Sequence, residues 1–238
     1  MKEIDPDALS AGERYKLLTG CVTPRPIAFV SSVSPGGRVN LAPFSFFNAA
    51  GADPMTLLFC PVTTPEGGDK DTLRNVVSGA EGGTGEFVVN VAVEDYARQL
   101  SATAEPLPYG ESEFDMAGFT PAPTRKVRPP RVLESPVSFE CVTTHVIRLA
   151  PGVPTSGNVV LGRVVHIWIR DDLVNDRLHV DATRLRTIGR MGGPSYCRTR
   201  ERFDLPRDLS AIDVAPPFDT DVGTEALRVR RRGGERDG

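Results

Sequence analysis

The sequence predicts a mainly β protein, an antiparallel, Greek-key-like barrel with peripheral helices. Several segments rich in β-branched and aromatic residues are spaced along the chain. Most successive segments are joined by short turns that contain glycine or proline, which is typical of hairpins. No G-x-G-x-x-G motif stands between a strand and a helix, so a doubly wound parallel sheet is not expected.

The first twenty residues form a helical lead-in (1–20) to a main domain over 21–205. Ser10 and Glu13 have the spacing of a capping box, and we expect the helix over 10–19 to end at Gly20. Prolines at 24 and 26 then extend the chain.

A hairpin follows this lead-in. Residues 27–33 predict a strand, 34–38 a glycine turn and 39–47 the return strand. Pro43 cannot donate a backbone hydrogen bond, so the return strand should lie at a sheet edge or contain a bulge.

Strands and short helices alternate in the next part of the chain. Residues 55–62 are apolar throughout and predict a strand buried on both faces. A helix is expected over 71–79 with Asp71 as its N-cap, a strand over 86–93, and a helix over 94–103 with acids in its first turn.

Residues 105–136 contain many prolines and no periodic apolar pattern, which predicts a long surface loop. The side chains expected to hold it to the body are Phe114, Met116, Phe119 and Val127. Residues 137–149 and 158–169 predict a long antiparallel hairpin. The tail, 206–238, ends in a polar, arginine-rich stretch without an apolar face, and disorder is expected there.

The composition is that of a soluble globular protein, with 39% hydrophobic residues and a net charge of −3. This balance gives no reason to expect nucleic acid or a membrane as partner. The acidic N-terminus is not a signal peptide, and no apolar run approaches the roughly 20 residues of a membrane span. Four scattered cysteines, including Cys21, lack metal-binding spacing and indicate a cytoplasmic protein without a metal site.

Residues 23–48, TPRPIAFVSSVSPGGRVNLAPFSFFN, carry the strongest functional signal. Amides and a hydroxyl at Asn40, Ser45 and Asn48 suit a flat, anionic, hydrogen-bonding cofactor better than acid–base catalysis. Strand alternation would place Phe44 and Phe46 on one face. The alternative is a half-buried strand whose phenylalanines belong to the core.

The hexamer KDTLRN at 70–75 opens a predicted helix. Unpaired N–H groups there, with Lys70, Thr72 and Asn75, suit a phosphate. The alternative is an ordinary capped surface helix.

Two further features have a functional and an ordinary explanation. The segment GRMGGPSYCR at 189–198 offers Arg190 and Tyr196 beside flexible glycines, and is otherwise a basic surface loop. His166 lies in an apolar strand, where it is either a core residue or a contact near a ligand.

The segments PRPIAFVSSV, NLAPFSFFN and KDTLRN together resemble the flavin-reductase-like family, whose members bind FMN on a split β-barrel. The resemblance covers roughly residues 15–205. It implies a cofactor-binding set of Arg25, Pro26, Ile27, Asn40, Leu41, Ala42, Phe44, Ser45, Phe46, Asn48, Lys70, Thr72, Asn75, Arg190 and Tyr196. Lys70, Thr72 and Asn75 would hold the phosphate, and Asn40, Ser45 and Asn48 the ribityl chain or the ring edge.

The resemblance also implies an activity. A homodimer would transfer hydride from NADH or NADPH to flavin N5, and then electrons to a small-molecule acceptor or a partner monooxygenase. No catalytic side chain is assigned, because the cofactor does the chemistry. The alternatives are a non-catalytic FMN-binding electron-transfer or carrier protein, and a structural barrel that binds a protein partner through its long loop.

Overall fold

The computed structural model describes residues 1–105, 107 and 111–207 of the chain. It divides the chain into two units, Met1–Arg200 and Glu201–Gly238. All described helices and strands belong to the first unit. The predicted disordered tail lies, from residue 208 onward, outside the described residues.

A seven-stranded sheet in the order β2-β1-β5-β8-β9-β4-β3 forms the body, and every strand pair in it is antiparallel. Its strands are β1 (Ala28–Val33), β2 (Val39–Phe44), β3 (Phe47–Ala52), β4 (Met55–Phe59), β5 (Glu86–Val91), β8 (Val137–Arg148) and β9 (Asn158–Ile169). The two edge strands, β2 and β3, are separated by only Ser45 and Phe46. Phe44 and Phe47 therefore lie within about 11 Å of each other. The sheet must curl until its edges meet, which confirms the predicted antiparallel barrel.

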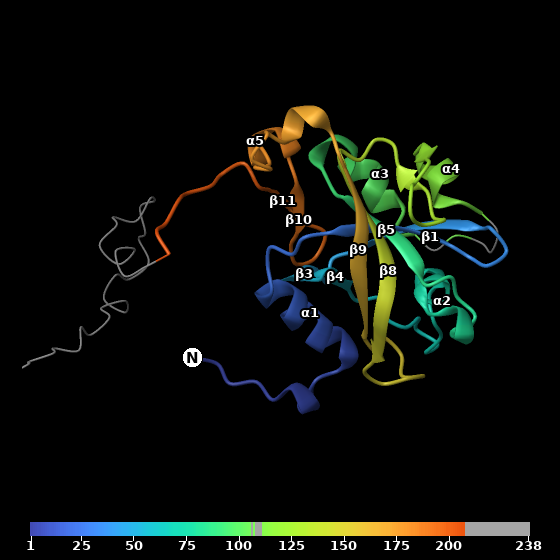
Figure 1. The fold of residues 1–238 in the computed structure, drawn as a ribbon. Helices are drawn as coiled ribbons and strands as arrows, with labels where there is room; N and C mark the ends of the chain where they lie inside the picture. Colours follow the sequence, from blue (N-terminus) through green and yellow to red (C-terminus); the bar gives the residue numbers. More distant parts are fainter. Residues whose placement is uncertain (106, 108–110, 208–238) are drawn as a thin grey trace, which may run out of the picture. The chain divides into compact units, whose positions relative to one another are not determined.

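Short helices and strand pairs surround the barrel (Figure 1). The helices are α1 (Ala11–Cys21), α2 (Asp71–Val76), α3 (Ala97–Ala102), α4 (Glu113–Ala117) and α5 (Ala182–Leu185). The small strand pairs are β6 (Pro121–Ala122) with β7 (Arg131–Val132), and β10 (Ile188–Arg190) with β11 (Tyr196–Arg198). In Figure 1, α2 lies on one side of β1, and α3 and α4 lie on the other.

Strand β1 separates two hydrophobic cores. Ala28 and Val30 face the barrel interior, which α2 covers with Leu73 and Val76. Ile27 and Phe29 face a second cluster outside the barrel, which includes Leu100 of α3 and Phe114 of α4. All six residues of β1 are buried, because packed layers cover both of its faces.

Polar groups on both faces of β1 are also paired. Ser31 Oγ donates to the Pro130 carbonyl at 2.5 Å, and Ser32 Oγ accepts from the Asn75 amide of α2 at 3.0 Å. On the Ser31 side, the buried Asn90 amide donates to the Phe29 carbonyl and its Oδ1 accepts from the Val132 N–H at 2.9 Å. Because buried polar groups are costly unless paired, these bonds fix α2 and the long loop against the same strand.

The N-terminal helix and the two hairpins agree closely with the sequence. The Ser10–Glu13 capping box is present, although α1 continues through Gly20 to Cys21. The β1–β2 and β8–β9 hairpins form as expected, with Pro43 in edge strand β2. The predicted return strand over 39–47 is wrong in one respect: it breaks at Ser45 and Phe46, where the chain leaves one sheet edge for the other.

Three other expectations need correction. The strand at 55–62 is shorter and not buried on both faces, because Thr56 and Leu58 are only half-buried and Met55, at the start of β4, is 44% exposed. The helix expected over 71–79 ends at Val76, and Lys70 instead of Asp71 occupies the N-cap position. Asp71 lies within the first turn, where it pairs with Arg74 at 3.0 Å.

The long loop contains more regular structure than expected, namely α4 and the β6–β7 pair. Phe114, Phe119 and Val127 are buried and hold it to the body, as predicted. Met116 is 43% exposed because it lies on the outer side of α4, so its predicted role is wrong. Glu140, fully buried in β8, accepts the backbone N–H groups of Arg125 and Lys126 at 2.8 and 2.6 Å and fastens the later part of the loop.

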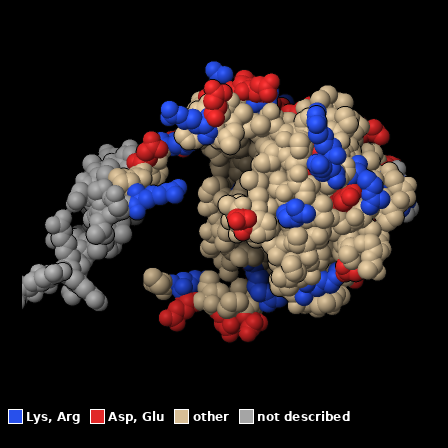
Figure 2. Space-filling model, in the orientation of Figure 1, with Lys and Arg blue, Asp and Glu red and all other residues tan. Residues whose placement is uncertain are grey.

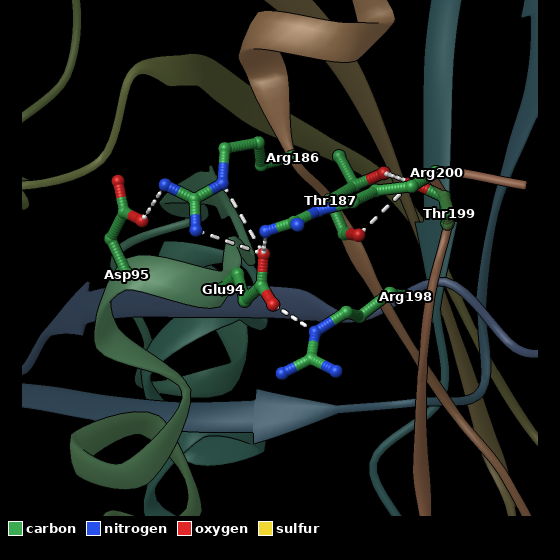
Figure 3. A network of polar contacts seen from close by, with 7 residues as sticks. All are labelled: Glu94, Asp95, Arg186, Thr187, Arg198, Thr199 and Arg200. Carbon is green, nitrogen blue, oxygen red and sulfur yellow. Dashed lines mark hydrogen bonds and ion pairs between the residues drawn. The ribbon is translucent and has the colours of Figure 1, made fainter.

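A network of ion pairs attaches the β10–β11 hairpin to the end of β5 (Figure 3). The Glu94 carboxylate accepts hydrogen bonds from Arg198, Arg200 and Arg186, the last at 3.0 and 3.2 Å. Arg186 also pairs with Asp95 at 2.8 Å. The Arg198 guanidinium is the main reason that the pKa of Glu94 falls to about 2, with Arg200 and Arg186 contributing in the same direction.

The first prediction follows from this network. The pKa of Glu94 in the folded chain is below its ordinary value of 4.5, so its stabilising effect is complete above about pH 4.5 and is lost as the pH falls toward 2. We expect Glu94→Gln to lower the free energy of unfolding near neutral pH. The difference from the wild type should shrink between pH 4.5 and 2, measured by urea unfolding at a series of pH values. Glu3→Gln, at an exposed position, is the control. A difference that stays constant down to pH 2 would contradict the assignment.

Candidate functional site

A cleft of ≈1170 Å³ opens along edge strand β2. Residues of β2 form its floor, residues around α2 one wall, and residues around α4 the other. Five residues of the predicted cofactor site line this cleft: Asn40, Ala42, Lys70, Thr72 and Asn75. Groups from two separate sequence motifs therefore meet at one concave surface, which is the expected setting for a ligand.

Two hydrogen bonds position the α2 wall. The Asn40 amide donates to Thr72 Oγ1 at 2.8 Å, which joins the floor to the wall. The Asn75 amide donates to Ser32 Oγ at 3.0 Å within the buried region, which holds α2 to β1. Thr72 and Asn75 are only 2% and 6% exposed, so the two bonds set the position of the wall before any ligand binds.

The charges of this wall leave a lysine available to an anion. Arg74 pairs with Asp71, and Asp69 accepts two hydrogen bonds from Arg148 at 2.8 and 2.9 Å. Among the described residues, Lys70 has no side-chain partner. Helix α2 has only six residues, so the full charge of Lys70 attracts an anion more strongly than the helix dipole does.

A second group of predicted residues gathers around the buried Arg25, which is 5% exposed. Its guanidinium donates to the carbonyls of Thr19, Val22 and Met191 at 2.6, 2.7 and 3.0 Å, and to Ser45 Oγ at 3.4 Å. The Thr19 carbonyl is in the last turn of α1, where the helix dipole favours a cation. Burial lowers the pKa of Arg25 from its ordinary value. An arginine remains charged even so, which a lysine would not do as readily.

Arg25 thereby fixes the corner between β2 and β3. Its guanidinium lies 5.9 Å from the centre of the Phe46 ring, which in turn lies 6.4 Å from the Tyr15 ring. Arg25 also exchanges backbone hydrogen bonds with Arg190 at 3.0 and 2.8 Å, and the Arg190 guanidinium stacks over Tyr196 at 4.6 Å. The predicted residues Ser45, Phe46, Arg190 and Tyr196 are thus connected through Arg25.

The other predicted residues lie elsewhere. The side chains of Ile27, Leu41 and Phe44 are buried in the two cores, so these residues present only backbone atoms to a ligand. Pro26 is exposed at the surface before β1, and Asn48 is exposed on β3, where its Oδ1 accepts the Ala49 N–H at 2.9 Å.

The two phenylalanines do not share a face as alternation predicted. Phe44 packs against Phe59 inside the barrel, with ring centres 5.1 Å apart, whereas Phe46 contacts Tyr15 of α1. The prediction is wrong because the strand ends between them and the alternation ends with it.

His166 is outside the cleft. It packs edge-on against Trp168 at 5.3 Å and lies opposite Glu140 in the β8–β9 ladder. The half-buried ring belongs to neither hydrophobic core, and both explanations of His166 stay predictions.

Two residues that the sequence did not single out contribute to the cleft. Ser32 holds α2, and its signal was a pair of serines in an otherwise apolar strand. Glu113 lines the opposite wall and accepts the Leu41 N–H at 3.0 Å. No local pattern indicates this contact, since the two residues are 72 positions apart.

A family model described as the flavin reductase like domain matches residues 19–189. The chain belongs to this family. An uncharacterised protein of Halalkalibacterium halodurans is 40% identical over 206 residues, covering 86% of this chain and 96% of that protein. Among solved structures, nitrilotriacetate monooxygenase component B of Bacillus cereus is 35% identical with a TM-score of 0.79, over 86% of this chain and 98% of that one. The 2-nitrobenzoate 2-nitroreductase NbaA of Pseudomonas fluorescens is 30% identical with a TM-score of 0.75, over 93% and 100%.

Family membership and these neighbours identify the chain as a flavin-related oxidoreductase on a split barrel. Within the described ranges, no three or more histidine, cysteine, aspartate or glutamate side chains are grouped as a metal ion requires. Every helix in the described part of the chain is too short or too polar to cross a lipid bilayer.

Proposed function

We propose that this protein binds FMN and reduces it with NADH or NADPH. The observation that carries the proposal is that β2 runs from the cleft, at Asn40 and Thr72, to the corner at Ser45 and Phe46. Five extended residues span roughly 17 Å, so phosphate-binding and ring-binding groups stand at the two ends of one elongated ligand.

The residues present fit the two ends of FMN. At the cleft end, the unpaired Lys70 ammonium and the Thr72 hydroxyl suit a phosphate, and Asn75 acts by holding α2 in place. At the corner, backbone groups beside Ser45 and the Phe46 ring suit the polar edge and the flat face of a flavin. Arg25 keeps this corner rigid, because its bonds join α1, β10–β11 and the corner.

When bound, FMN accepts hydride from the nicotinamide and passes electrons to an acceptor. The protein's own part is to bind and orient both ligands. We propose Arg190 and Tyr196 as contacts of the nicotinamide nucleotide, and their position beside Arg25 supports this role.

The acceptor is proposed from the similar proteins. One is named as a component of a monooxygenase and another as a nitroreductase. We therefore propose either a partner monooxygenase or a small molecule as acceptor.

A cytoplasmic location is also proposed. The four cysteines are free, which suits a reducing cytoplasm.

A homodimer is the proposed assembly. Helix α1 exposes Tyr15, Leu17 and Leu18, and strand β3 is exposed at the sheet edge. Figure 2 shows a hollowed face with few charged side chains between the charged groups near α5 and those near α1. Exposed apolar side chains on α1 and the exposed residues of β3 favour a second copy of the chain as partner.

The activity is tested by visible spectroscopy under argon. We expect NADH or NADPH to bleach the flavin bands of the FMN-loaded protein much faster than those of free FMN at the same concentration. The donor that bleaches faster is the preferred one. A bound flavin that neither nucleotide bleaches would show a carrier or electron-transfer protein in place of a reductase.

The phosphate position is tested by Lys70→Ala. Loss of a charge-assisted contact worth about 1.5–3 kcal/mol should weaken FMN binding roughly 10- to 100-fold. Riboflavin, which lacks the phosphate, should bind the variant and the wild type equally, as measured by flavin fluorescence. Lys126→Ala, an exposed lysine outside the cleft, is the matched control. Equal FMN affinity in all three proteins would refute the assignment.

The assembly is tested by Leu18→Glu, measured by size-exclusion chromatography with light scattering. A charge buried at the proposed interface should shift the protein from dimer to monomer. Leu178→Glu, at a position 81% exposed and distant from α1 in sequence, should leave the mass unchanged. A wild type that is monomeric at micromolar concentration would rule the homodimer out.

A further inference from the structure

Strand β2 is an edge strand, and the Leu41 N–H is directed away from β1 into the cleft side. Its partner is the Glu113 carboxylate of α4, with Oε2 accepting at 3.0 Å. The Leu41 side chain is completely buried, so the strand cannot shift to release this bond. Glu113 therefore joins the α4 wall to the strand on which the proposed flavin lies.

Glu113 lines the same cleft as Asn40, Lys70 and Thr72. The other acidic groups around this cleft are Glu66, Asp69, Asp71, Glu105, Glu111 and Asp115. The basic groups are Arg38, Lys70 and Arg74. Arg74 and Asp71 pair with each other and Asp69 pairs with Arg148, so acids outnumber bases among the remaining charged residues of the cleft.

The surroundings of Glu113 favour its neutral form. Burial is the main cause that raises its pKa above the ordinary value, and the negative charge of Asp71 acts in the same direction. The Leu41 N–H opposes this by stabilising the carboxylate. A phosphate bound at Lys70 would add further negative charge to the same cleft and favour the neutral form more strongly.

We propose that Glu113 belongs to the flavin site and takes up a proton when the phosphate of FMN binds in the cleft. The neutral carboxyl still accepts the Leu41 N–H through its carbonyl oxygen, so α4 stays attached to β2. Its O–H becomes a donor directed to an anionic ligand, in place of a repelling charge. This inference rests on the proposed function, because it concerns the same cleft.

The direction of the effect follows from linkage. A group whose pKa is higher in the complex than in the free protein makes binding tighter at low pH and weaker at high pH. For a difference of one pKa unit, FMN affinity changes about tenfold across the titration of Glu113. The phosphate of FMN titrates near pH 6 by itself, and a comparison of two variants removes that contribution.

The experiment measures the FMN dissociation constant from pH 5 to 8.5 for the wild type and Glu113→Gln. Glutamine keeps an acceptor for Leu41 and mimics the neutral carboxyl. The ratio of wild-type to variant constants should be near one at low pH and rise about tenfold at high pH. Calorimetry of the wild type in buffers of different ionisation enthalpy should show proton uptake on binding.

Glu111→Gln is the matched control, since Glu111 is exposed on the same wall. The ratio of wild-type to Glu111→Gln dissociation constants should not change with pH. A flat ratio for Glu113→Gln, an equal rise for Glu111→Gln, or no proton uptake by the wild type would each overturn the role of Glu113 while FMN binding stands. No FMN binding at any pH in either protein would instead refute the proposed function.

Discussion

The site depends on one strand that is buried on both faces and polar at two adjacent positions. Ser31 and Ser32 point to opposite sides of β1, since side chains alternate along a strand. Ser32 holds α2 through Asn75, and Ser31 holds the later part of the long loop at Pro130. Each hydroxyl is fully buried, so leaving either unpaired would be costly. The two elements that flank β1 therefore cannot move independently of it. Strand β2 pairs with β1 along its whole length and forms the floor of the cleft, so the floor is fixed relative to the same two elements.

The fold was predictable wherever short-range patterning determines it. Strands β8 and β9 are long, β-branched and joined by a loop rich in proline, glycine and serine, and β1 and β2 flank a glycine turn, so local signals predicted the correct pairing of both hairpins. The break at Ser45 and Phe46 was not predictable from that pattern. It arises because β2 and β3 belong to opposite edges of one curled sheet, and closure of a barrel is a property of all seven strands.

The candidate site, like the fold, was predictable from the sequence only in part. Asn40 and Thr72 were proposed from separate motifs, and their side chains form a hydrogen bond at 2.8 Å. The motifs indicate which side chains suit a ligand, but not which hydrogen bonds hold those side chains in position. Arg25 was expected among the residues that contact the cofactor, whereas its guanidinium is buried among carbonyl oxygens at the end of α1 and at Met191. Glu113 lies in a proline-rich stretch without a periodic apolar pattern, and its hydrogen bond to β2 depends on tertiary packing alone.

The two ends of the site differ in the groups that surround their positive charges. At the corner, the charge of Arg25 is shared by carbonyl oxygens and by the end of a helix, and no carboxylate of the described residues accepts a hydrogen bond from it. A fixed cation of this kind holds the corner in one geometry at any physiological pH. At the cleft end, Lys70 lies among lining residues in which acids outnumber bases, and under the proposed function a neutral Glu113 would repel a bound phosphate less than a charged one. In the proposed complex with FMN, the rigid corner would orient the flavin ring, and protonation of Glu113 would adjust the charge of the cleft to the phosphate.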